Sequence, residues 1–156
     1  MKACKVLAIL RSLLLVGGMS LSSVGALAQA GGALQTQETN VQGVSAELIE
    51  CSRKAGVLTV KLRFRASAEK KTWFNIDTGH GAYAGFYVVA GDKKHFILRD
   101  AEGAPIAPKA LGGVHLNKGE THLWWAKFPA PGIEVKQVKL VLPEVLPFED
   151  IPVTDK

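Results

Sequence analysis

Cysteine and methionine are scarce in this chain of 156 residues. Both methionines, Met1 and Met19, stand near its start together with Cys4, which leaves Cys51 as the one later cysteine. A single cysteine excludes an intramolecular disulfide framework, and a stretch without methionine excludes a thioether copper site. We expect Cys51 to be a small buried hydrophobe in a strand. An intermolecular disulfide is the alternative in an oxidising compartment.

The chain also lacks an apolar run of the roughly 20 residues that a membrane-spanning helix needs. The apolar run near its start, Leu13 to Val16 with a sparser continuation to Leu21, is interrupted by Gly17, Gly18 and Ser20. Positive residues precede this stretch and small residues follow it, which is typical of a cleavable signal peptide. The positive residues are Lys2, Lys5 and Arg11.

We therefore expect residues 1–28 to be a signal peptide, cleaved after Ala28 or Ala30, because both sites end a small-x-small pattern. No cysteine follows either site directly, so a lipid anchor is not expected. The processed protein should lie in the periplasm or outside the cell, without stable membrane insertion.

Strong positive charge is missing once the leader is set aside. The whole chain has a formal net charge of +5, but three of its nineteen Lys and Arg residues belong to the leader. Sixteen remain against fourteen Asp and Glu, a net charge of about +2. The densest basic group is Lys61, Arg63 and Arg65, which alternate with apolar residues like the wet face of a strand. Nucleic-acid binding is therefore not expected.

Helical periodicity is absent, and alternation with a period of two dominates from Val44 onward. The clearest case is Val57 to Arg65. Here one face holds Leu58, Val60, Leu62 and Phe64. The other strands are expected at 44–51, 86–89, 95–99, 121–128, 135–142 and 148–153. About seven strands without a helix predict an all-β fold, a single antiparallel β-sandwich over residues 44–156. Residues 29–43 have no period and should be a flexible lead-in.

Two stretches, 67–83 and 103–119, have no period and are expected to be long loops, which in compact domains are often functional. The first contains Asp77-Thr78-Gly79, a triplet that aspartic proteases use. A single copy would need a dimer to form the carboxylate pair. An ordinary turn is the simpler interpretation.

No other motif indicates catalysis or metal binding. The four histidines, His80, His95, His115 and His122, lack the short spacing of metal ligands. The serines lack a nucleophile frame. We expect no enzyme, no metal and no cofactor.

Adjacent tryptophans are the remaining clue. Trp124 and Trp125 fall on one strand, so their side chains point to opposite faces and one must leave the inner face. We expect Trp125 to be the partly exposed one. It could be capped by neighbouring side chains, or it could anchor a protein or glycan partner. Trp73, Phe74 and Tyr83 could extend such a patch.

Three strings give a resemblance to exported bacterial immunoglobulin-like domains of unknown function. They are residues 95–103 (HFILRDAEG), 125–131 (WAKFPAP) and 147–153 (PFEDIPV). Similar domains occur alone behind a signal peptide or beside OmpA-like peptidoglycan-binding domains, and they resemble immunoprotective extracellular antigens in fold. This resemblance implies an immunoglobulin-like sandwich with an envelope address, and it implies no active-site residues. No OmpA-like module is visible here, so cell-wall tethering is not expected.

The sequence thus predicts a non-enzymatic binding or accessory module that recognises a protein or cell-envelope component. Recognition would use an exposed sheet face or the long loops, with Trp125, Trp73 and Tyr83 as binding residues. The alternatives are a small-ligand or metal carrier that uses the 67–83 and 103–119 loops and, more remotely, a small hydrolase. We expect a monomer, with a dimer linked through Cys51 as the other option.

Overall fold

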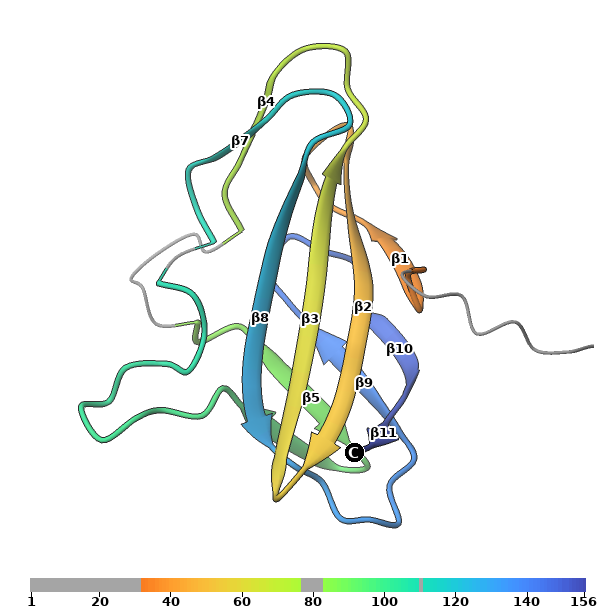
Figure 1. Ribbon diagram of the computed structural model, residues 1–156, viewed down its shortest axis with the longest axis vertical. Helices are drawn as coiled ribbons and strands as arrows, with labels where there is room; N and C mark the ends of the chain where they lie inside the picture. The colour runs from red at the N-terminus through yellow and green to blue at the C-terminus, as the bar shows by residue number, and fades with distance from the viewer. Residues whose placement is uncertain (1–31, 77–82, 110) are drawn as a thin grey trace, which may run out of the picture.

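The computed structural model describes residues 32–76, 83–109 and 111–156, and all regular elements in these ranges are β-strands (Figure 1). These residues therefore include no helix that could cross a membrane. Two larger sheets lie one in front of the other, and a pair of short strands lies to one side (Figure 1). The expected signal peptide and the Asp77-Thr78-Gly79 triplet lie outside the described residues.

The first sheet has the strand order β1-β2-β3-β8, all antiparallel, and β11 adds to β2 in the parallel direction. Its strands are β1 (Gln35–Glu38), β2 (Val44–Lys54), β3 (Val57–Ala66), β8 (Thr121–Pro129) and β11 (Thr154–Asp155). Strand β3 shows why these segments are strands: its even positions from Leu58 to Phe64 are fully buried while the odd positions reach solvent. β2 and β3 meet in a two-residue turn, Ala55-Gly56.

The second sheet has the strand order β10-β9-β5-β6 and is antiparallel throughout. Its strands are β5 (Tyr87–Ala90), β6 (Lys93–Phe96), β9 (Gln137–Val141) and β10 (Phe148–Pro152). The β5–β6 hairpin turns through Gly91 and Asp92. Gly91 has a φ of 61°, and glycine at this first position favours a type II′ turn.

The core fills the space between the two sheets. Trp124 and Phe64 enter it from the first sheet, and Val88 and Leu140 enter it from the second. The ring of Phe86, which immediately precedes β5, lies 5.6 Å from the ring of Trp124 and so joins the two layers. Burying one large side chain of this kind stabilises the fold by about 1.5–3 kcal/mol.

Arg53 holds the C-terminal strand in place. Its side chain is buried, and its Nε and Nη2 donate to the carboxylate of Asp155 at 2.7 and 3.2 Å. Its other bonds go to backbone carbonyls of Pro131, Gly132, Ile133 and Val135. A buried guanidinium needs partners for its donors, so Arg53 fixes both β11 and the 131–135 segment against β2.

The structure confirms the main strands that alternation predicted. The segments expected at 57–65 and 121–128 are β3 and β8, each one residue longer. The sheet begins earlier than expected, however, because β1 lies within the 29–43 segment and pairs with Ser45–Leu48 of β2. The side chains of Gln35 and Gln37 donate to backbone carbonyls near β10. An edge strand held by such polar bonds leaves no apolar period in the sequence.

The two expected loops also differ from expectation. β4 (Thr72–Phe74) lies in the first and β7 (Val114–Leu116) in the second, and the two pair antiparallel. Three residues are too few for a period to be visible. The strands therefore number more than the seven expected.

Candidate functional site

Two exposed apolar side chains lie side by side on β8. Leu123 is 62% exposed and Trp125 is 38% exposed, while Trp124 between them is 1% exposed. Alternation along the strand is the cause, because residues two apart share a face. We call the side chains of β2, β3 and β8 that point away from the core the outer face. Leu123 and Trp125 are its apolar part.

A row of cations lies beside this apolar pair on the neighbouring strand. Lys61 is directly opposite Trp125, and Arg63 is directly opposite Leu123. Arg65, opposite Thr121, completes what we call the basic row. Side chains directly opposite in an antiparallel pair have Cβ atoms about 5 Å apart, so Trp125 and Lys61 are cross-strand neighbours on the outer face, with the Lys61 ammonium 2.7 Å from Glu50 of β2.

Glu47 on β2 binds two members of the basic row. Nε of Arg63 lies 2.5 Å from its Oε2, and Nε of Arg65 lies 2.8 Å from its Oε1. Burial raises the pKa of the Glu47 carboxyl, but the hydrogen bonds from Arg65 and Arg63 and their charges outweigh burial, so the net shift of this pKa is downward. Glu47 is therefore held as a carboxylate that already has two cationic partners.

Glu50, also on β2, is occupied in the same way. Its Oε1 accepts hydrogen bonds from Lys156 and Ser52 at 2.6 Å each, and Nζ of Lys61 lies 2.7 Å from its Oε2. The bond from Lys156, then those from Lys61 and Ser52, lower the pKa of Glu50 to about 2. Glu50 thus offers little negative charge to an external cation.

The outer face consequently carries an excess of positive charge. Its cations on β3 and β8 are Lys61, Arg63, Arg65 and Lys127, and its carboxylates on β2 are Glu47 and Glu50. Within the described ranges no ion pair involves Lys127. This combination of apolar and cationic side chains suits a partner that offers an apolar group beside negative charge.

Trp73 is exposed too, but on a different part of the molecule. It lies on β4, opposite His115 of β7, and is 57% exposed. It lines an open hollow of about 550 Å³ together with Lys70 and Lys71. The hollow also contains Gln42, Gly43, Ala68, Glu69 and Thr72. Pairing of β4 with β7 thus joins the two expected loops. Trp73 lines a hollow that Trp125 does not line.

Tyr83 is not a surface residue, so its expected place in a binding patch is wrong. Its side chain is 2% exposed, and its hydroxyl donates to the backbone C=O of Pro108 at 2.7 Å. The same hydroxyl accepts from Nε1 of Trp124 at 3.4 Å. Phe74, at 0% exposed, is buried as well. The aromatic residues near 73–83 therefore divide: Trp73 faces solvent, and Phe74 and Tyr83 pack into the core.

Cys51 is buried at 1% exposure, as expected. Burial, aided by the charge of Glu50, raises the pKa of its thiol to about 12. Because the thiolate is the reactive form, this position gives no support to a dimer linked through Cys51.

The histidines in the described ranges are His95, His115 and His122. No group of three metal-ligating side chains occurs among the described residues. His122 packs its ring edge-on against Phe74 at 6.3 Å, and burial lowers its pKa. This position is typical of a histidine that packs against the core.

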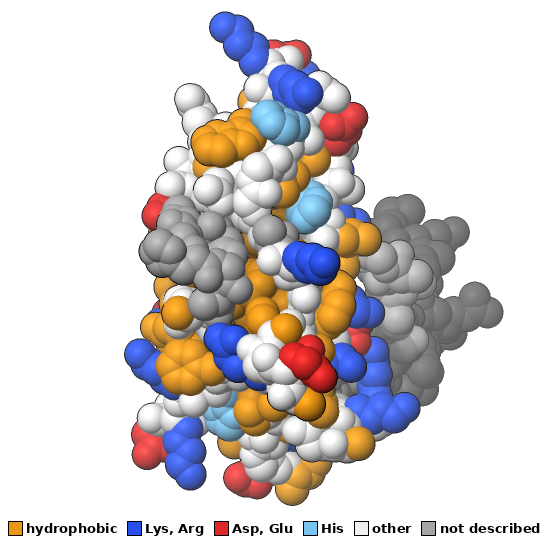
Figure 2. All heavy atoms as spheres, turned by 90° about the vertical axis from the view of Figure 1, so that its left-hand side faces the viewer, with side chains coloured by type: hydrophobic (Ala, Val, Ile, Leu, Met, Phe, Trp, Pro, Cys, Tyr) orange, Lys and Arg blue, Asp and Glu red, His pale blue; other side chains and the backbone are white. Residues whose placement is uncertain are grey.

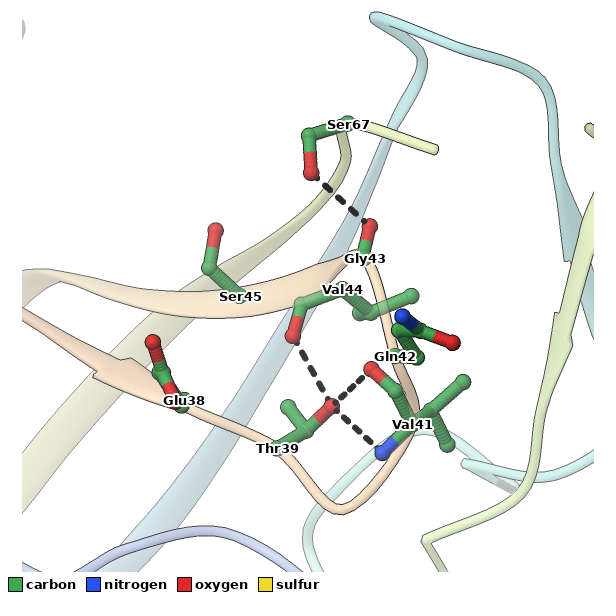
Figure 3. A pocket seen from close by; sticks show the side chains of 8 residues that line it. All are labelled: Glu38, Thr39, Val41, Gln42, Gly43, Val44, Ser45 and Ser67. Carbon is green, nitrogen blue, oxygen red and sulfur yellow. Dashed lines mark hydrogen bonds between the residues drawn. The ribbon is translucent and has the colours of Figure 1, made fainter. Parts of the chain in front are cut away.

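A polar hollow of about 310 Å³ lies where the chain turns from β1 into β2 (Figure 3). The Thr39 hydroxyl donates to the backbone C=O of Val44 at 2.9 Å and accepts from the N–H of Val41 at 3.2 Å. Ser67 donates to the C=O of Gly43 at 3.3 Å. These groups serve the turn itself, so the hollow is a weaker ligand site than the outer face.

Leu123 is the residue that the sequence reasoning missed. The signal was present, because it lies two residues before Trp125 and must share its face. The chain matches no family model, no curated protein and no solved structure.

Proposed function

We propose that this chain is an exported immunoglobulin-like β-sandwich that acts as a non-enzymatic binding or accessory module. Two stacked antiparallel sheets around one core support the sandwich. The resemblance to exported bacterial immunoglobulin-like domains supports the family and the address. We infer that residues 1–28 direct export to the periplasm or beyond. N-terminal sequencing of the secreted product should begin at Gln29 or Gly31, and an N-terminus at Met1 would contradict export by cleavage.

The observation that carries the proposed function is the exposed pair Leu123 and Trp125 beside the basic row. Monomeric proteins expose single apolar residues freely, but adjacent large ones on a face with net positive charge are typical of interfaces. The partner is a protein or a cell-envelope component that places an apolar group on Trp125 and negative charge near Lys127.

The test is recovery of partners from an envelope extract of the producing bacterium by the wild-type protein and by Trp125→Ala. Leu146→Ala is the matched control, because Leu146 is 57% exposed in the segment before β10, away from the outer face. We expect Trp125→Ala to lose a partner that Leu146→Ala retains. Equal recovery by both variants would sink the assignment of this face.

A small-ligand or metal carrier is the second candidate, because Trp73, Lys70 and Lys71 line one hollow. An anionic ligand could stack on the indole of Trp73 and pair with the lysines. Metal analysis of the purified protein, together with ligand binding that is lost in Trp73→Ala and kept in Trp125→Ala, would favour this candidate over the outer face.

A further inference from the structure

The hollow that Trp73 lines lies where the β1–β2 turn meets the segment between β3 and β4, and it measures about 550 Å³. Hydrogen bonds and close packing hold the backbone that forms it. The N–H of Ser67 donates to the C=O of Gly43 at 2.8 Å, and a Cβ on Gly43 would lie 2.7 Å from that of Ala68. The Thr72 hydroxyl donates to the C=O of Lys70 at 3.3 Å. The hollow is therefore preformed, which lowers the entropy cost of binding.

Trp73 supplies the large apolar side chain of this hollow. It follows Thr72 and precedes the fully buried Phe74 on β4, so alternation directs its indole outward. Pairing with β7 sets it opposite His115, which is also exposed. Figure 2 faces the side on which β4 and β7 lie, and at its upper end hydrophobic, histidine and Lys or Arg side chains gather on one surface. The exposed indole can stack on a flat apolar group of a ligand.

Ammonium groups outnumber carboxylates around this hollow. Lys70 and Lys71 line it, and Lys118 of the turn before β8 bonds Glu69, which also lines it. Glu120 accepts hydrogen bonds from the turn that precedes it, and these bonds together with the charge of Lys71 lower its pKa. Three cations thus stand against two carboxylates that already have partners. The surplus of positive charge favours a ligand with negative charge.

The polar hollow of about 310 Å³ at the β1–β2 turn adjoins this one, because both include Gln42 and Gly43. Ser45 of β2 and Glu38 of β1 are directly opposite each other in that second hollow, and their side chains point the same way in Figure 3. Gln42, which belongs to both hollows, is exposed and carries an amide. A ligand that extends beyond Trp73 therefore meets hydroxyl, carboxylate and amide groups, which can hydrogen-bond to the hydroxyls of a ligand.

We propose that this hollow binds an acidic carbohydrate, one unit of which stacks on the indole of Trp73 while its carboxylate pairs with Lys70 or Lys71. The inference deepens the second candidate function, whose site it shares, and is independent of the outer face. A pyranose ring has a flat C–H face that fits an indole, hydroxyls around its edge and, in a uronic acid, one carboxylate. The ammonium groups match that carboxylate, and the groups of the second hollow match the hydroxyls of a neighbouring unit.

The shape of the site favours an oligosaccharide over a small aromatic acid. Sites for small molecules bury about 70–90% of the ligand surface, whereas the hollow at Trp73 is open to solvent and continues into a second hollow. A chain of sugar units can occupy such a surface with one unit on the indole and the next unit beside Gln42.

Isothermal titration calorimetry of the purified protein, expressed from the full chain, tests the proposal. The probes are trimers of galacturonic and glucuronic acid, with trimers of galactose and glucose as neutral counterparts and inorganic phosphate as a bare anion. We expect an acidic trimer to bind with a dissociation constant below about 1 mM, and the neutral trimer and phosphate to bind at least about tenfold more weakly. Binding of the acidic trimer should weaken as salt rises, because salt screens exposed charges.

Single substitutions locate the binding site. Trp73→Ala should weaken binding of the acidic trimer at least about tenfold. Ile133→Ala is the matched control, because Ile133 is another exposed apolar residue and lines neither hollow, and it should bind like wild type. Both variants should melt near the wild-type temperature, since each loses an exposed side chain. Binding that Trp73→Ala keeps, or that Trp125→Ala loses, would overturn the proposed site.

A double substitution tests the charge. Lys70→Gln with Lys71→Gln should weaken binding of the acidic trimer, whereas Lys93→Gln with Lys94→Gln, two exposed neighbours on β6, removes the same charge and should not. Failure to bind either acidic trimer at about 1 mM, or equal binding of the neutral trimer, would overturn the proposal. Phosphate that binds as tightly as the acidic trimer would also overturn it, although an anion carrier would remain. None of these results affects the test of the outer face.

Discussion

The turn between β2 and β3 stores backbone strain that a single substitution should release. Ala55 has a φ of 48° and Gly56 a φ of 77°, and these two residues link the last β2–β3 pair, Lys54 and Val57. Positive φ at both central positions defines a type I′ turn, for which Asn-Gly is the preferred sequence. An L-residue with a Cβ pays about 1–2 kcal/mol in the left-handed region, and Asn pays less because its short amide bonds locally.

Ala55→Asn should therefore raise the free energy of unfolding by about 1 kcal/mol. Ala55→Gly also removes the steric cost, but it adds entropy to the unfolded chain worth about 0.4–1 kcal/mol, so its gain should be smaller. Gly56→Ala should act in the opposite direction and cost about 1–2 kcal/mol. A Cβ at Gly56 would meet no atom within 4 Å, so this loss reports backbone conformation alone.

Urea unfolding followed by tryptophan fluorescence is the assay. With a slope of about 2 kcal/mol per molar urea, a gain of 1 kcal/mol moves the midpoint up by about 0.5 M. Ala101→Asn is the control, because Ala101 is an exposed turn residue without positive φ, and it should change stability by less than about 0.5 kcal/mol. An unchanged or lower midpoint for Ala55→Asn, together with a tolerated Gly56→Ala, would refute the type I′ assignment.

Three further predictions concern pH, core packing and a close backbone contact. The pKa of Glu50 is lowered from 4.5 to about 2, so the stability that its carboxylate contributes is complete above pH 4.5 and is lost as pH falls toward 2. Glu50→Gln should therefore make the free energy of unfolding, measured with urea, less dependent on pH over that range. The control Glu102→Gln, on an exposed turn, should leave this pH dependence unchanged. Trp124→Ala removes a side chain that is 1% exposed and should lower the free energy of unfolding by about 3–5 kcal/mol, while Trp125→Ala should keep the melting temperature near wild type. Similar losses of stability in both variants would contradict the placement of Trp124 in the core and Trp125 on the outer face. Gly43 has a φ of 78°, and a Cβ there would lie 2.7 Å from that of Ala68, so Gly43→Ala should lower the melting temperature more than Gly56→Ala does, and an equal loss would mean that Ala68 yields without cost.

Alternation predicted most of the strands, because burial on one side of a sheet imposes a period of two on the sequence. The segment from Leu58 to Phe64 and the opposite orientation of Trp124 and Trp125 could both be read in this way. The strands that the sequence did not predict are those whose position does not depend on an alternating buried face. β1 relies on glutamine side chains at an edge, and β4 and β7 are three residues long. The burial of Tyr83 was not predicted for a related reason, since no period reports that a residue just before a turn packs into the core.

By itself the sequence determined an all-β chain with its alternating strands, the outward side of Trp125, and a charge that is modest once the expected leader is removed. These are local properties, fixed by side-chain order along one strand. The tertiary structure alone decided which strands are neighbours. It placed the basic row beside Leu123 and Trp125, paired Glu47 and Glu50 with cations, and buried Tyr83. Pairing between strands distant in sequence depends on the packing of the whole core, which no single segment encodes.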